Sequence, residues 1–181
     1  MPRIYPIDPA TATGDAATHL ATTRKMFGRA PNVFATAANS PSTVGALVGL
    51  WAGVGSGTLG AKLGEQLAIV VAQSNGCEYC LSAHTALGKM HGLDDAELAA
   101  AKQAGSRDPK TAAMLKLALE INQSRGQVSD MVLGQARKAG ITDSEIIEII
   151  GHVALNVFTN YLNNVSETEI DFPVVPLDAA A

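Results

Sequence analysis

Both cysteines of the chain lie in one short run, NGCEYCLSAH, at residues 75–84. Cys77 and Cys80 are three positions apart, and His84 follows four positions after Cys80. If the run is helical, the three side chains share one face, and the helix dipole favours the thiolate form of a cysteine near the N-terminus. These residue types at this spacing predict either a redox centre or half of a metal site.

Three interpretations of the cysteine pair are open. Free cysteine is often a small buried hydrophobe, although chance rarely places both cysteines and a histidine on one helical face. Two thiolates and an imidazole can bind zinc, but a closed structural site has four ligands, so Glu65 or a water would have to complete it. In the third interpretation, which the sequence favours, one thiolate attacks an oxidant and the other closes a local disulfide.

Within the redox interpretation, position along the helix assigns the roles. Cys77 lies at the helix N-terminus beside the Asn75-Gly76 turn, where we expect it to be the more exposed sulfur. Cys80 is one turn further in, and His84, one turn beyond, can take the Cys80 proton directly or through a water. We therefore expect Cys80 to attack a peroxide bond, Cys77 to resolve the sulfenic acid as a disulfide, and His84 to act as the base.

Helical patterns cover nearly the whole chain, and no segment reads as a convincing strand. The tail from residue 170 contains Pro173 and Pro176 and is expected to be extended. The sequence thus predicts an all-α fold with the cysteine pair at the N-terminus of a core helix. We expect a single domain over 1–181, made of an N-terminal segment (1–30), a helical core (31–165) and a C-terminal arm (166–181). The expected helices cover 15–27, 32–38, 41 into the glycine-rich loop 53–60, 63–74, 77–90, 94 or 95 to about 105, a longer helix opened by 108–109, 129–139 and 144–165.

Composition narrows the classes of partner. Hydrophobic residues make up 47% of the chain and charged residues 17%, which predicts more apolar surface than a lone monomer needs and hence subunit contacts. A net charge of −4 without a Lys/Arg cluster argues against nucleic acid and acidic membranes. The first residues lack the apolar core of a signal peptide, and no apolar stretch is long enough to span a membrane. We expect a cytoplasmic protein, in which a close cysteine pair is more often reactive than structural.

The cysteine run also carries a family resemblance. Glu65, eleven further residues and then Cys-x-x-Cys-x-x-x-His resemble the signature of the alkylhydroperoxidase D (AhpD) group within the carboxymuconolactone decarboxylase-like superfamily. The stretches 151–161 and 169–173 are similar to a longer branch labelled "peroxidase-related". The resemblance implies an all-helical subunit, a trimer or hexamer, and no bound cofactor. It also implies that Glu65 forms a proton relay with His84 and a water, which activates Cys80.

Taken with the cysteine chemistry, the resemblance predicts a dithiol peroxidase acting in antioxidant defence. Its partners would be a hydroperoxide substrate and a dithiol or protein disulfide reductant. One position departs from the family pattern: the best-known members have a second histidine immediately before the attacking cysteine, where this chain has Tyr79. A phenol is a poorer proton shuttle at neutral pH, but it can donate a hydrogen bond or form a wall of the substrate pocket.

Polar residues also recur every four positions along the last helix, and they predict either a cavity lining, a subunit interface or a solvated face. His152 and Asn156 are the members of this stripe that we expect to line a substrate pocket, and Asn160 and Asn164 continue it. Two functions from other classes remain as alternatives. One is a muconolactone-type decarboxylase, whose chemistry would not require the dithiol. The other is a non-catalytic thiol module, such as a redox sensor or a zinc-binding interaction protein.

Overall fold

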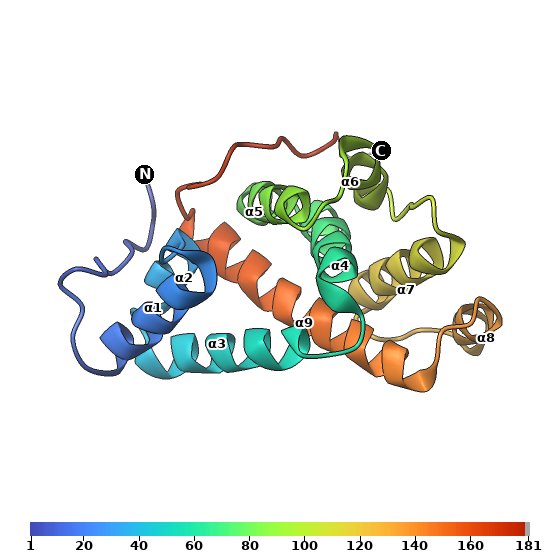
Figure 1. Cartoon of the computed structure of the whole chain (residues 1–181), viewed down its shortest axis with the longest axis horizontal. Coiled ribbons are helices and arrows are strands. Elements are labelled where there is room, and N and C mark those ends of the chain that lie inside the picture. Colours follow the sequence, from blue (N-terminus) through green and yellow to red (C-terminus); the bar gives the residue numbers. More distant parts are fainter. Residues whose placement is uncertain (180–181) are drawn as a thin grey trace.

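The computed structural model describes residues 1–179, and within them every regular element is a helix, which confirms the all-α fold. Nine helices follow one another along this part of the chain (Figure 1). They are α1 (Gly14–Phe27), α2 (Asn32–Ala37), α3 (Pro41–Gly55), α4 (Gly60–Ser74), α5 (Glu78–Met90), α6 (Asp95–Lys102), α7 (Pro109–Ser124), α8 (Asp130–Lys138) and α9 (Asp143–Ser166).

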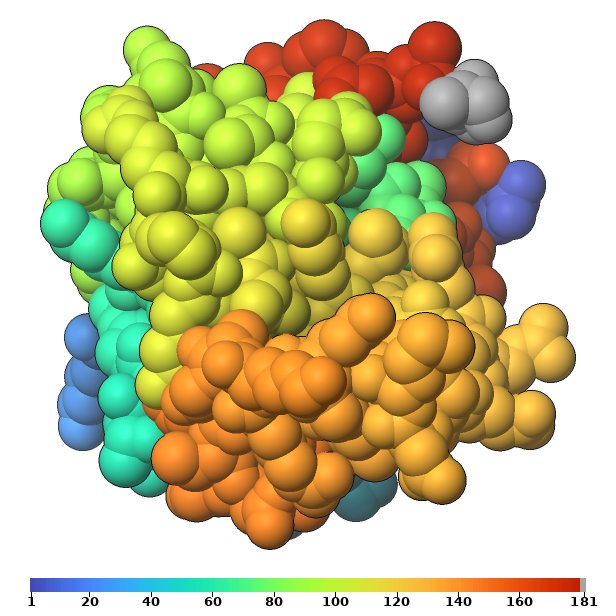
Figure 2. Space-filling model, turned by 90° about the vertical axis from the view of Figure 1, so that its right-hand side faces the viewer, coloured from blue at the N-terminus to red at the C-terminus, as the bar shows by residue number. Residues whose placement is uncertain are grey.

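Helix α4 is the centre of the fold. It packs against α5, α6, α7 and α9, and its residues from Glu65 to Ala72 are all buried. A helix that is apolar on nearly every side is stable only when neighbours cover it all round. The long helix α9 crosses the molecule beside α3, while α1 and α2 lie at one end and α7 and α8 at the other (Figures 1 and 2).

Helix ends follow signals in the sequence. The capping box expected at the start of the last helix is confirmed, because Thr142 accepts from the Glu145 amide and the Glu145 carboxylate accepts from the Thr142 amide. Asp108 caps α7, with Pro109 in the first turn. Gly76 adopts a φ of 64°, a left-handed conformation that glycine tolerates, and so ends the turn before α5.

Two helix boundaries differ from the expected ones by more than one residue. Helix α4 begins at Gly60, three residues before the expected start, because the Glu148 carboxylate of α9 accepts from the backbone amides of Thr58 and Leu59. This cap comes from a residue about ninety positions away, so local sequence could not reveal it. Helix α6 ends at Lys102, earlier than expected, and the left-handed backbone at Ala104 (φ 52°) turns the chain away.

The C-terminal arm is extended, as expected, over the residues described, and residues 180 and 181 lie outside them. It runs over α5 towards α6 (Figure 1). The amide of Val175 donates to the Ser82 hydroxyl on α5 at 2.9 Å, and the Lys102 ammonium on α6 pairs with Asp178 at 2.8 Å. The arm therefore closes the fold over the helix that carries the cysteines.

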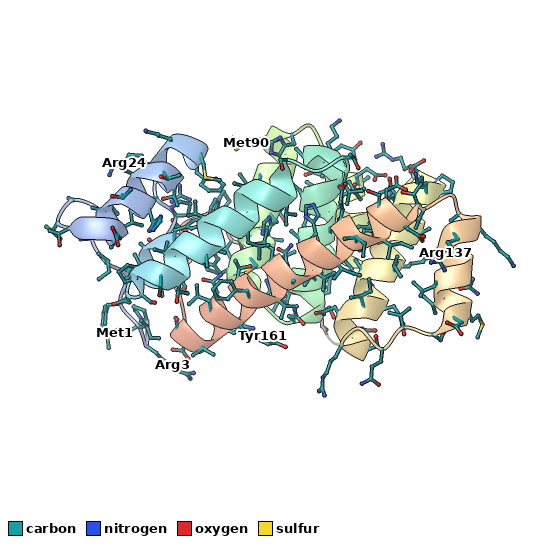
Figure 3. All side chains as sticks on the ribbon, turned by 90° about the horizontal axis from the view of Figure 1, so that it is seen from below. Met1, Arg3, Arg24, Met90, Arg137 and Tyr161 are labelled. Atoms are coloured by element: carbon teal, nitrogen blue, oxygen red, sulfur yellow. A yellow bond between two sulfur atoms is a disulfide. The ribbon has the colours of Figure 1, made fainter. Side chains whose placement is uncertain are left out.

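The outer side of α9 exposes apolar residues, including Tyr161, which Figure 3 places on the side of the helix turned away from the core. This surface is compatible with the subunit contacts predicted from composition, which stay a prediction. Among the described residues, no helix is long and apolar enough to cross a membrane.

Candidate active site

The two cysteines form a disulfide at the start of α5. Both are buried, with exposed fractions of 0% for Cys77 and 2% for Cys80, so the expectation that Cys77 is the more exposed sulfur is wrong. The Asn75-Gly76 turn folds the Cys77 amide onto the Ala72 carbonyl at 2.9 Å. The Cys77 sulfur then caps α5 by accepting from the Cys80 amide at 3.3 Å, which turns it inward.

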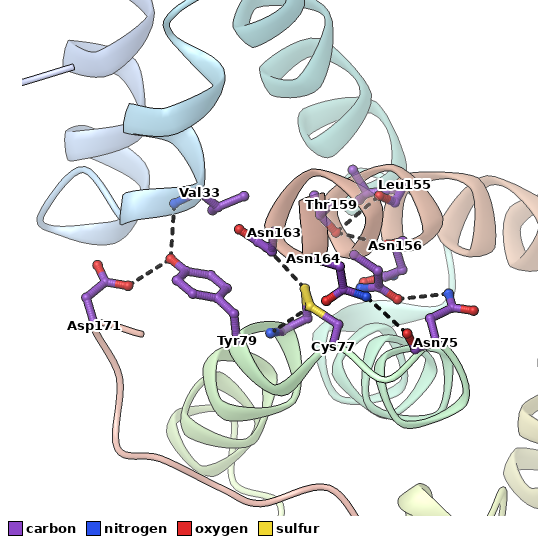
Figure 4. The surroundings of a disulfide bond; sticks show 12 residues. Val33, Asn75, Cys77, Tyr79, Leu155, Asn156, Thr159, Asn163, Asn164 and Asp171 are labelled. Atoms are coloured by element: carbon purple, nitrogen blue, oxygen red, sulfur yellow. Dashed lines mark hydrogen bonds between the residues drawn. A yellow bond between two sulfur atoms is a disulfide. The ribbon is translucent and has the colours of Figure 1, made fainter. Parts of the chain in front are cut away.

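A side-chain amide from α9 contacts the second sulfur. The Asn163 Nδ2 group donates to the Cys80 Sγ at 3.2 Å, and both residues are buried (Figure 4). An N–H donor directed at sulfur stabilises the negative charge of a thiolate in a site of low dielectric constant. After reduction, each sulfur therefore has one N–H donor: Asn163 for Cys80 and the Cys80 amide for Cys77.

A buried imidazole–carboxylate pair lies on the next turn of α5. The Nδ1 atom of His84 is 2.7 Å from Oε2 of Glu65, which comes from the neighbouring helix α4. The carboxylate fixes the orientation of the ring, and its bond to Nδ1 leaves Nε2 to exchange a proton elsewhere. The Trp51 indole stacks on His84, with ring centroids 5.9 Å apart and an interplanar angle of 13°. The imidazole is thus held from two sides.

The first of the two cavities that His84 lines, here called the aromatic cavity, reaches Cys80. His84 and Asn163 supply polar groups to its wall, and its volume is about 30 Å³, space for only one or two waters. Five aromatic side chains line it: Phe27, Phe34, Trp51, Tyr79 and Phe172. A small apolar molecule is the ligand that this lining favours beside the sulfur.

The second cavity, here called the polar cavity, lies against Glu65, the carboxylate that contacts the His84 imidazole. Glu65 and His84 line it together with His91, His152 and Asn156, and its volume is about 160 Å³. His84 and Trp51 line both cavities. Cys80 lines the aromatic cavity but not the polar one, and Glu65 lines the polar cavity but not the aromatic one. Four titratable side chains and a volume for several waters make this a space that can hold water next to the carboxylate.

Tyr79 is a wall and an anchor. Its hydroxyl donates to Asp171 of the C-terminal arm at 2.7 Å and accepts from the Val33 amide at 3.1 Å (Figure 4). Burial, reinforced by the adjacent Asp171 carboxylate, raises the pKa of the Tyr79 phenol well above its usual range. The phenol therefore stays neutral with its one proton committed to Asp171. Of the roles expected for it, the pocket wall agrees with this geometry and donation to a substrate does not.

Asp171 in turn joins the arm to the N-terminal helices. It forms an ion pair with Arg29 and accepts from the Asn32 amide at 3.1 Å. The Arg29 guanidinium lies 4.4 Å from the centre of the Phe172 ring, a cation–π contact. Phe172 thereby reaches the wall of the aromatic cavity from the far end of the sequence.

The polar stripe of α9 divides into two parts. His152 and Asn156 line the polar cavity next to His84, whereas the Asn160 Oδ1 accepts from the Asn75 side chain at 2.9 Å. Asn164 donates to the Asn75 carbonyl at 3.1 Å. The second part therefore ties α9 to the turn before the cysteines and does not line either cavity.

Three residues of the site were not identified from the sequence as functional. His91 follows His84 by seven positions, which places it on the same helical face, and Asn163 stands in the same relation to Asn156. Trp51 had no signal beyond being the one tryptophan in a long uncharged run. Over residues 1–179, no group of three or more His, Cys, Asp or Glu side chains is arranged to hold a metal ion.

Similarity to known proteins agrees with this architecture. Residues 41–106 match the family model of the carboxymuconolactone decarboxylase family, and no curated protein matches the chain. A peroxidase-related protein from Silicibacter sp. TM1040 has the same fold, with a TM-score of 0.78, 20% identity, and coverage of 92% of this chain and 91% of that one. The alkylhydroperoxidase AhpD core protein from Ralstonia eutropha JMP134 gives a TM-score of 0.79 at 23% identity, with coverage of 94% and 92%.

A third solved structure with this fold is named for a different reaction. It is the debrominase Bmp8, a variant of which was solved in complex with 2,3,4-tribromopyrrole. Its TM-score is 0.79 at 18% identity, and the alignment covers 93% of this chain and 91% of Bmp8. One helical architecture therefore carries proteins described by different reactions.

Proposed function

We propose that the chain, whose residues 41–106 match the carboxymuconolactone decarboxylase family and whose fold is that of AhpD-like proteins, is a dithiol peroxidase that reduces hydroperoxides. The observation that carries the proposal is the placement of Cys80, disulfide-bonded to Cys77, in one cavity with His84, whose other nitrogen contacts Glu65 at 2.7 Å. A nucleophile, a resolving thiol and an oriented base are the parts that the reaction requires.

The first step is attack by Cys80. In the reduced protein His84 Nε2 takes the Cys80 proton, and Asn163 stabilises the thiolate. The thiolate attacks one oxygen of ROOH, so that an S–O bond forms and the O–O bond breaks. The leaving alkoxide takes the proton from His84 and departs as ROH, which leaves Cys80 as a sulfenic acid.

The second step is resolution by Cys77. Its sulfur attacks the Cys80 sulfur, the S–S bond forms, the S–O bond breaks, and water leaves. The two thiols have then given two electrons to the hydroperoxide, and an external dithiol restores them by thiol–disulfide exchange. The Cα atoms of the two cysteines are 5.4 Å apart, a distance that a disulfide spans without movement of the backbone.

The test is to mix the reduced protein with hydrogen peroxide or cumene hydroperoxide and to follow thiol loss and disulfide formation by mass spectrometry. We expect one disulfide per chain between Cys77 and Cys80. Cys80→Ser should abolish dithiol-dependent peroxide consumption, whereas Cys77→Ser should still react once and leave a sulfenic acid that dimedone traps. The two variants serve as matched controls for each other, because each removes one sulfur from the same helical turn.

Each outcome decides one part of the proposal. If the reduced wild type forms no disulfide with any hydroperoxide, the proposed activity is wrong. If Cys80→Ser keeps full turnover, the assignment of the nucleophile is wrong. Stoichiometric zinc in the purified protein, together with inert thiols, would instead favour the zinc-binding interaction protein. Decarboxylation by a variant without cysteines would favour the muconolactone-type enzyme.

A second candidate function is the reductive removal of halogen from an aromatic ring. Five aromatic side chains line the cavity at Cys80, and such a lining suits a planar apolar ring, which these side chains would have to move apart to admit because the cavity is about 30 Å³. In that reaction two thiols would become a disulfide while a C–Br bond is replaced by C–H and HBr is released. The structural similarity to a debrominase makes this worth testing: 2,3,4-tribromopyrrole is offered to the reduced protein, and bromide release is compared with peroxide loss.

A further inference from the structure

The hydroperoxide is attacked outside the polar cavity, because Cys80 does not line it. We propose that it is the route by which protons from solvent reach the cysteine pair, with His91 and His152 passing them to the Glu65–His84 pair. This inference rests on the proposed function and adds two residues to it. It also accounts for the position of His84 between the two cavities.

The reaction needs such a route when the disulfide is reduced. An external thiolate attacks a sulfur, and each cysteine released in turn leaves as a thiolate that must take up a proton. Both sulfurs are buried, and the aromatic cavity beside Cys80 is small and lined mainly by rings. A substrate that fills that cavity would also exclude water from it. Protons therefore have to arrive through His84 from its other side.

His91 stands at the outer end of the polar cavity. Its side chain is 44% exposed, and its Nε2 is 4.0 Å from Oε1 of Glu65, whose own side chain is only 12% exposed. A water or a small ring rotation closes a gap of that size. The other carboxylate oxygen of Glu65, Oε2, is the one that contacts His84. The carboxylate thus has one oxygen towards each imidazole, as a proton relay requires.

His152 lines the cavity from α9. A Cβ on Gly64 would lie 3.1 Å from its Cε1, so glycine at that position leaves room for the imidazole ring. The carbonyl of His152 accepts from the Asn156 side chain at 2.8 Å. Its ring nitrogens make no hydrogen bond to any described residue. They are therefore free to bind the waters of the cavity.

The charge state of His152 suits a relay. Burial lowers the pKa of this imidazole below its ordinary value, although the nearby carboxylates of Glu148 and Glu65 oppose the effect, and a proton on His84 would add to it. The charged or titratable groups that act on it are these three. A neutral imidazole has one N–H and one free nitrogen, and it can therefore accept and donate a proton in the same event.

The experiment uses His152→Gln and His91→Gln in the full chain, with dithiothreitol as reductant and hydrogen peroxide as oxidant. We expect steady-state turnover to fall roughly tenfold in His152→Gln and less in His91→Gln, because a relay group is lost but water remains. Imidazole added to the buffer should restore turnover in proportion to its concentration, and deuterium oxide should slow the variants more than the wild type. The first turnover of pre-reduced protein should keep its wild-type rate.

The matched control is His19→Gln, which changes the one histidine that lines neither cavity and should leave turnover unchanged. Wild-type turnover and isotope effect in the double variant His91→Gln/His152→Gln would overturn the route. So would a loss that imidazole does not restore, since that would mark a structural role. His91 is half exposed, so its variant tests the route even if His152→Gln fails to fold. A wild type that forms no disulfide with hydrogen peroxide would refute the peroxidase instead.

Discussion

The two cavities at His84 differ in nearly every property although one imidazole and one indole line both. The aromatic cavity holds one or two waters at most, is walled by rings and touches the sulfur. The polar cavity is about five times larger, about 160 Å³ against about 30 Å³, and is walled by a carboxylate and three histidines. The difference separates what each side of the imidazole can receive: an apolar substrate on one, protons and water on the other.

The supports of the two cavities differ as well. Residues of α4, α5 and α9 supply most of the titratable groups of the polar cavity, and these helices form the middle of the fold. The aromatic cavity depends on segments from both ends of the chain, since α1 supplies Phe27 and the C-terminal arm supplies Phe172. The proton side is therefore built on rigid packing, whereas one wall of the substrate side belongs to an extended segment.

The largest expected effect comes from breaking the polar side at its carboxylate. Glu65→Gln keeps the size of the side chain and removes the charge that orients His84 and receives its proton. We expect peroxide turnover to fall about 100-fold, in the range that loss of acid–base assistance produces. The measurement is steady-state hydrogen peroxide consumption with dithiothreitol, together with the pH dependence of Cys80 alkylation by iodoacetamide.

The matched control for that change is Glu78→Gln, which removes the same charge from an exposed position between the two cysteines. Its turnover should stay within about threefold of the wild type, since an exposed first-turn carboxylate contributes little to the site. Equal losses in the two variants would show that net charge near the helix matters and that the Glu65–His84 pair does not.

The next effect comes from the aromatic side. Phe172→Ala removes one wall of the cavity, together with the ring that Arg29 contacts, and leaves every titratable side chain of the site in place, so bulky and small substrates should respond differently. We expect the KM for cumene hydroperoxide to rise about tenfold with little change in kcat, because about 1.4 kcal/mol of apolar contact is lost. The values for hydrogen peroxide should not move. Steady-state kinetics with both oxidants measure the split.

Phe158→Ala is the control, because Phe158 is the one phenylalanine of four that does not line the aromatic cavity. It is half-buried on α9, so it tests whether general loss of packing raises the KM. If both variants raise the KM alike, or if Phe172→Ala affects hydrogen peroxide as much as cumene hydroperoxide, the aromatic cavity is not the substrate side.

Much of this arrangement follows from local sequence. The capping box of the last helix, the prolines in first turns and the 3.6-residue periodicity predicted nearly all the helices, because these signals act within a few residues. The spacing of Cys77, Cys80 and His84 also predicted the face that they share. Local sequence could not predict how deeply each sulfur is buried. Cys77 was expected to be the more exposed of the two, and the turn before it instead directs its sulfur inward.

The missed parts all depend on contacts between distant segments. His91 lies at a helix end, and only the approach of α4 to α5 places it 4.0 Å from Glu65. Asn163 reaches Cys80 across 83 positions of sequence. The sequence left several roles open for the Tyr79 hydroxyl, and the structure shows that it donates a hydrogen bond to Asp171, 92 positions later. Periodicity gives the face of a helix but not what another element brings to that face.

The smallest expected effect on catalysis comes from Tyr79→Phe, which keeps the ring in the cavity wall and removes only its hydroxyl. Turnover with either oxidant should stay within about twofold of the wild type, because the phenol proton is committed to Asp171. The stability should fall by roughly 2 kcal/mol, since the Val33 amide loses its acceptor and a hydrogen bond to a carboxylate is lost. Urea unfolding gives the free energy, and the same samples give the rates.

Tyr161→Phe completes this prediction, because Tyr161 is exposed and its loss of a hydroxyl should change neither quantity. The result that would contradict the assignment is a Tyr79→Phe variant with wild-type stability and a strongly reduced rate, since that pattern belongs to a proton donor in the reaction. A Tyr79→Phe variant with wild-type free energy of unfolding and wild-type rate would also contradict it, by showing that the Arg29–Asp171 ion pair alone holds the arm. Loss of stability without loss of rate places Tyr79 among the walls of the aromatic cavity and outside the proton transfers of the reaction.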